Sequence, residues 1–105
     1  MGWFYLLIAA VFEIGWPFGL KMASFSTVKI YLIIFAVLTM TLSGLFLYYA
    51  QKEIPVGTAY AIWTGIGAVG TFLLGILVFH DSTNLLRFMG VVFIILGVIM
   101  LKLCH

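Results

Sequence analysis

Residues 54–79 read IPVGTAYAIWTGIGAVGTFLLGILVF, and this stretch contains no charged side chain. A second uncharged stretch covers residues 30–51. A helix needs roughly 20 apolar residues to cross the hydrocarbon core of a bilayer, and both stretches are long enough. They predict two membrane-spanning helices, because strands in lipid would need a closed barrel with alternating polar faces.

Three short polar segments divide the rest of the chain, at residues 21–29, 51–55 and 80–87. They leave four apolar segments, at about 2–22, 30–50, 57–79 and 85–103. The first has no signal-peptide features, so we expect it to be retained as a helix. The sequence therefore predicts an all-α membrane protein, with four transmembrane helices in a single domain over residues 1–105.

The composition of the 105-residue chain excludes other classes of protein. Apolar residues make up 66% of it and charged residues 8%, and the mean hydropathy is +1.32. A soluble enzyme cannot cover its surface with so few polar side chains. The five bases are too few and too scattered to bind nucleic acid. Cys104 is the sole cysteine and cannot form an internal disulfide, and the adjacent His80 and Asp81 lack further metal ligands. We expect no cofactor and no metal.

The bases fall almost evenly on the two sides of the predicted bundle. Four spans place Lys52 and Lys102 on the side of both termini, and Lys21, Lys29 and Arg87 on the opposite side. Orientation in the membrane follows the excess of Lys and Arg in cytoplasmic loops, and here the excess is small. The sequence predicts that the chain inserts in both orientations, so that opposite copies can pair as an antiparallel homodimer.

Glu13 is the one charged residue expected in the interior of a span, away from its ends. It lies about 12 residues, or roughly 18 Å, from the start of the first helix, near the middle of the bilayer. A charge there costs at least about 2.5–3.5 kcal/mol and usually marks an ion pathway. Every base lies at a span end, so no internal ion pair accounts for it. We expect Glu13 to bind protons and a cation in turn; the alternative is a protonated acid that only holds a neighbouring helix.

Three residues near Glu13 have candidate roles. Trp16, at i+3, places an indole N–H donor on the same helix face. Pro17 has no N–H for the carbonyl of Glu13, so we expect it to bend the helix and free that carbonyl beside the site; a kink that only shapes packing is the alternative. Ser43, in the second span, can reach a carboxylate on a neighbouring helix or bond back to its own helix.

The third span carries a stripe of Tyr60, Trp63, Thr64 and Gly67, at i, i+3, i+4 and i+7. Aromatic faces beside an anion suit a weakly hydrated cation, although such a stripe also occurs in plain helix packing. The stripe therefore makes Tyr60 and Trp63 candidates for the aromatic surroundings of a cation near Glu13.

Glycines recur within the third and fourth spans. Gly65, Gly67 and Gly70 match the dinucleotide-binding pattern GxGxxG, but no strand precedes them and they lie within a span. We interpret them as positions for close helix contact and flexing in the membrane. Gly90 and Gly97 are seven residues apart on the fourth span and predict a smooth face for pairing with another helix.

Together these residues resemble the small multidrug resistance family. The motifs are FEIGW at residues 12–16, GLK at 19–21 and PVGTAYAIWTGIG at 55–67, and the similarity extends over the whole chain to the segment 97–103. The resemblance implies a multi-pass protein of a bacterial cell membrane that works as a proton-coupled antiporter. It also implies an antiparallel homodimer in which Glu13 of both subunits forms one shared site; a paired heterodimer stays open.

Within this family, Trp16 and the segment 63–67 resemble the guanidinium exporters. That resemblance implies that Trp16 and Ser43 hydrogen-bond Glu13, that Tyr60 lines the site and couples the two glutamates, and that Trp63 packs beneath it. A planar guanidinium forms parallel N–H bonds to a carboxylate. Pro17 and Ala10 depart from the family pattern, so efflux of quaternary ammonium or other lipophilic cations is the alternative. A membrane subunit that transports nothing is a further one.

Overall fold

A computed structural model describes residues 1–104, which form four helices. These are α1 (Gly2–Ala23), α2 (Lys29–Gln51), α3 (Val56–Phe79) and α4 (Leu85–Cys104). Each predicted apolar segment agrees with one helix to within one residue at either end. All four are long and apolar enough to cross a membrane, with mean hydropathies between 1.5 and 2.3. The prediction of an all-α protein with four spans is confirmed.

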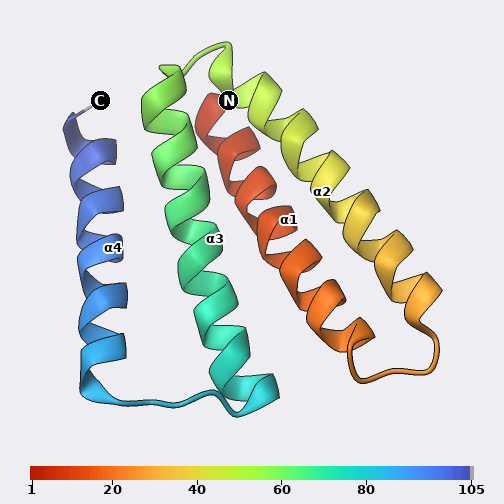
Figure 1. The fold of residues 1–105 in the computed structure, drawn as a ribbon. Coiled ribbons are helices and arrows are strands. Elements are labelled where there is room, and N and C mark those ends of the chain that lie inside the picture. Colours follow the sequence, from red (N-terminus) through yellow and green to blue (C-terminus); the bar gives the residue numbers. More distant parts are fainter. Residues whose placement is uncertain (105) are drawn as a thin grey trace.

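The helices lie side by side in the order α4, α3, α1, α2 (Figure 1). Both chain ends and the α2–α3 connection lie at one end of the bundle, and the other two connections lie at the opposite end. The subunit is flattened, with extents of 45 × 34 × 16 Å. Large apolar side chains are therefore exposed on every helix, as lipid or another subunit requires. No residue of α4 is buried.

The helix α1 lies between α3 and α2, and it packs closely against α2 because its contact positions are small. A Cβ atom on Gly15 would lie 3.2 Å from Cγ2 of Thr39, and one on Gly19 would lie 2.8 Å from the ring of Phe35. The buried core lies among α1, α2, α3 and the α2–α3 connection. Its members are Leu6, Ala9, Leu47, Ala50, Ile54, Ala59 and Ile62.

The three glycines in the middle of α3 lie where this helix meets its neighbours. A Cβ atom on Gly65 would lie 2.6 Å from Cγ2 of Val98 in α4, and one on Gly70 would collide with Ile14 in α1. A Cβ atom on Gly67 would lie 2.7 Å from Cγ of Glu13. Close helix contact is thus their structural role in the subunit, and flexing at these positions stays a prediction.

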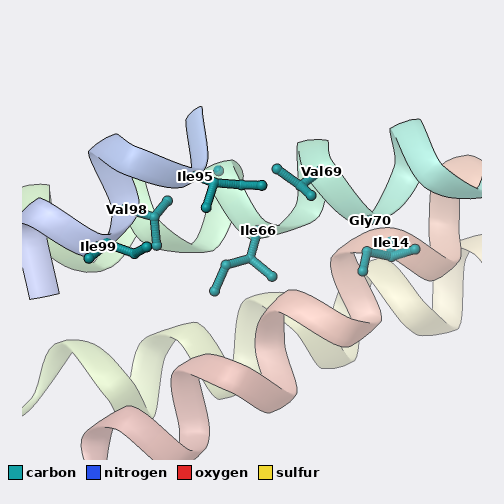
Figure 2. Close-up of a pocket in the computed structure, with 8 residues that line it drawn as sticks. Ile14, Ile66, Val69, Gly70, Ile95, Val98 and Ile99 are labelled. Carbon is teal, nitrogen blue, oxygen red and sulfur yellow. The ribbon is translucent and has the colours of Figure 1, made fainter. Parts of the chain in front are cut away.

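Contacts between α4 and the rest of the subunit are sparse. The ring of Phe88 packs edge-on against Phe72 of α3, with 5.7 Å between centroids. Elsewhere α4 leaves a cavity of about 250 Å³ between itself, α3 and α1, into which Ile14, Ile66 and Val98 project (Figure 2). No heavy atom among the described residues lies within 4 Å of a Cβ placed on Gly90 or Gly97. Their predicted face is open, and its pairing with another helix stays a prediction.

Candidate cation and proton site

Glu13 lies near the middle of α1 and is partly buried. Its side chain extends toward α3, where it occupies the space that a side chain at position 67 would fill. Because Gly67 has no Cβ, the Glu13 side chain can pack directly against the backbone of α3. The glycine in α3 therefore fixes where the Glu13 side chain can lie.

The Glu13 carboxylate has one hydrogen bond within the described chain. The indole Nε1 of Trp16 donates to its Oε1 at 2.8 Å, as the i+3 spacing predicts. No ion pair reaches this carboxylate from any base in residues 1–104. The second carboxylate oxygen thus has no protein donor and can take a proton or a cation.

A buried hydrogen-bonded network lies one helical turn before Glu13. Trp63 Nε1 donates to Ser43 Oγ at 2.8 Å and to the backbone carbonyl of Ala9 at 3.3 Å. Ser43 Oγ donates in turn to the Ala9 carbonyl at 2.7 Å. Ser43 and Ala9 are both fully buried. The network joins α1, α2 and α3 and holds the α1 backbone in register beside the site.

This network differs from the expected hydrogen bond between Ser43 and Glu13. A serine hydroxyl has one proton, and here Ala9 accepts it because α1 and α2 are in direct contact at these two small residues. Ser43 therefore acts on the backbone one turn from Glu13 rather than on its carboxylate in this conformation. Sequence reasoning missed the Ala9 carbonyl, since a backbone acceptor leaves no signal in residue type.

Replacement of Ser43 tests the network. In Ser43→Ala the Trp63 indole keeps only its longer bond to Ala9, so we expect the free energy of unfolding to fall by about 1–3 kcal/mol. Reversible unfolding in mixed micelles measures this. Thr41→Ala is the matched control, because the exposed Thr41 hydroxyl bonds only to Val37 of its own helix. Equal effects of the two substitutions on the free energy of unfolding would show that the network does not stabilise the fold more than an ordinary hydroxyl in a helix does.

Tyr60 and Trp63 pack against each other edge-on, with 5.3 Å between ring centroids. The Tyr60 side chain is 55% exposed and lies about 10 Å along α3 from Gly67. It has no hydrogen bond to Glu13 in the part of the chain that the structure describes. A role of Tyr60 in lining the site or coupling two glutamates stays a prediction that involves a second subunit. Trp63 contacts the site through the Ala9 network.

Pro17 lies within α1, and the helix continues past it to Ala23. Proline has no N–H, so the carbonyl of Glu13 lacks its usual donor at i+4. The predicted bend and the use of this carbonyl by a ligand stay predictions. Pro17 also contributes to the wall of a cavity between α1 and α3, near the α3–α4 connection.

The chemistry available at this site is that of one carboxylate. No group of three His, Cys, Asp or Glu side chains that could hold a metal ion occurs among the described residues. A carboxylate with one indole donor, set in an apolar helix, can bind a proton or a cation. Protonation removes its charge, so the protonated group binds a cation much more weakly. This competition is the simplest basis for coupling two fluxes.

Comparison with known proteins places the chain in a family. The family model described as Small Multidrug Resistance protein matches residues 1–103. A guanidinium exporter of Proteus vulgaris is 46% identical over 103 residues, which cover 98% of both chains. The guanidinium exporter of Escherichia coli (strain K12) is 44% identical over 104 residues, covering 98% of this chain and 97% of its own.

A guanidinium exporter of Yersinia pestis is likewise 44% identical over 104 residues, with 98% of both chains covered. These bacterial relatives match 98% of this chain, whose four helices are long and apolar enough to cross a bilayer. The chain therefore belongs to the small multidrug resistance family, as a multi-pass transport protein of the bacterial inner membrane.

Proposed function

We propose that the protein is a proton-coupled antiporter that exports guanidinium or substituted guanidinium ions. The observation that carries this proposal is Glu13, a partly buried carboxylate in a membrane-spanning helix, which has one indole donor and no ion pair among residues 1–104. The guanidinium exporters that share 44–46% of its sequence support the substrate class.

The mechanism follows from competition at the carboxylate. A planar guanidinium forms two parallel N–H bonds to a carboxylate, and a protonated carboxyl offers only one good acceptor and no charge. Binding of the cation therefore displaces protons, and binding of protons releases the cation. An inward proton gradient then drives cations outward. Trp16 orients the carboxylate through one lone pair of Oε1, which leaves the other lone pair of Oε1 and both lone pairs of Oε2 to accept the two bonds from the ligand.

The transporting unit in this proposal is an antiparallel homodimer with two Glu13 residues in one site. The flattened subunit supports a partner, as does α4, which has no buried residue. The open face at Gly90 and Gly97 offers a contact surface for it. The nearly even bases favour insertion in both orientations. A heterodimer with a related subunit is the other arrangement that fits these features.

Electrophysiology on purified protein in proteoliposomes tests the proposal. We expect transport currents with guanidinium and much smaller currents with tetraalkylammonium ions, which have no N–H donors for the carboxylate. The expected preference is at least about tenfold, because a site built for hydrogen bonds rejects a ligand that has no donors. Larger currents with tetraalkylammonium would indicate multidrug efflux. The absence of a transport current with every cation would indicate a subunit that transports nothing.

A further inference from the structure

A second cavity, of about 240 Å³, lies between α1 and α3 near the α3–α4 connection. Its walls combine one carboxylate, one ammonium group and two aromatic rings, from Asp81, Lys21, Phe18 and Phe79. The space is several times the roughly 30 Å³ that a water molecule takes in the liquid. It is therefore large enough for a small organic cation.

The cavity continues along the same α1–α3 contact that contains Glu13. Pro17, in its wall, follows Glu13 by one helical turn, and Thr71 follows Gly67 by one turn. One turn of four residues is about 6 Å along a helix. The inner end of the cavity thus lies about one helical turn from the site, and Asp81 lies beyond the end of α3 at its outer end.

The backbone places the Asp81 carboxylate over the end of α3. The chain turns sharply at His80, which has a left-handed conformation with φ of 57°. The Asp81 N–H then donates to the carbonyl of Gly75 at 3.0 Å. The Asp81 side chain lies so close to Gly75 that a Cβ there would collide with Oδ2. Gly75 makes this position possible.

The two opposite charges of the cavity do not pair with each other. Within residues 1–104, Asp81 has no ion pair and accepts no side-chain hydrogen bond. The Lys21 ammonium lies 5.3 Å from the ring centroid of Phe25 and 6.0 Å from that of Phe79. Lys21 thus occupies the cation–π position beside the cavity, and the carboxylate at its mouth is left available.

We propose that this cavity is an outer cation site on the path to Glu13. A guanidinium ion pairs with Asp81, competes with Lys21 for the face of Phe79, and then moves one turn inward. This inference rests on the proposed function for its substrate. Both Asp81 and Lys21 are exposed, so the site is weak and acts by raising the local concentration of cations.

Transport kinetics of the full protein give the first test. We expect Asp81→Asn to raise the apparent KM for guanidinium roughly two- to fivefold, the size typical of an exposed ion pair. Lys21→Gln removes the competitor and should lower the apparent KM. Glu53→Gln is the control, because Glu53 lies at the opposite end of the subunit beside the N-terminus. Equal effects of Asp81→Asn and Glu53→Gln, or a lost maximal rate with unaltered KM, would overturn the proposal.

Binding to a dimer that cannot transport gives the second test. In Glu13→Gln we expect guanidinium to shift the amide NMR signals of Gly75 and Thr71, and these shifts should vanish in Glu13→Gln/Asp81→Asn. The result does not depend on transport, so it separates this inference from the proposed function. Unchanged Gly75 and Thr71 signals across a full guanidinium titration of Glu13→Gln would rule out the outer site.

Discussion

We expect Glu13→Gln to abolish proton-driven cation uptake in proteoliposomes. Glutamine has nearly the same shape, and its amide oxygen can still accept the Trp16 indole N–H that lies 2.8 Å from Glu13 Oε1. The substitution therefore leaves the packing of α1 on α3 intact. It removes the charge that attracts a cation and the group that carries a proton, and we expect the rate to fall to that of empty liposomes.

The control for this substitution is Glu53→Gln. Glu53 is the other glutamate of the chain, and it lies in the α2–α3 connection, 3.8 Å from the N-terminal amine. An ion pair so exposed contributes at most about 1 kcal/mol, and it lies far from α1's centre. Transport by Glu53→Gln at close to the wild-type rate is expected. Coupled transport that survives in Glu13→Gln would remove Glu13 from the mechanism.

Gly67→Ala is expected to cause the second large loss. The new Cβ would lie 2.7 Å from Cγ of Glu13, well inside van der Waals contact. Either the carboxylate moves or α3 shifts away from α1, and a misplacement of about 1 Å can cost on the order of 100-fold in rate. We expect a 10- to 100-fold loss of guanidinium transport in an intact dimer.

Gly57→Ala is the matched control, since it makes the same change in the same helix where no heavy atom lies within 4 Å of the added methyl group. Initial rates of uptake and gel filtration of both variants provide the comparison. If Gly67→Ala transports as well as Gly57→Ala, the glycine does not determine the position of Glu13.

The helices could be predicted closely from sequence because the chain is so short of polar residues. Each polar cluster, such as residues 51–55, falls at a connection, and an apolar run in lipid has no alternative to a helix. The hydrogen bond between Trp16 and Glu13 could also be predicted from the sequence, since helical geometry alone brings residues i and i+3 together. Local spacing and composition were sufficient for both.

Contacts between helices were harder to predict from the sequence. The partner of Ser43 is a backbone carbonyl 34 residues away, and backbone acceptors are present at every position of a sequence. The placement of Asp81 over Gly75 depends on a left-handed residue at His80, a conformation that histidine adopts only occasionally. The exposed position of Tyr60 reflects the flattened subunit, and its predicted role at the site needs a partner subunit to test it.

The most direct test of the central claim is proton movement driven by the cation alone. Wild-type proteoliposomes are loaded with guanidinium at equal pH inside and outside, and are then diluted into buffer without it. Exchange at Glu13 predicts that outward guanidinium flux acidifies the lumen, and that Glu13→Gln liposomes show no such signal. Guanidinium efflux without lumenal acidification in the wild type would contradict coupling at this carboxylate.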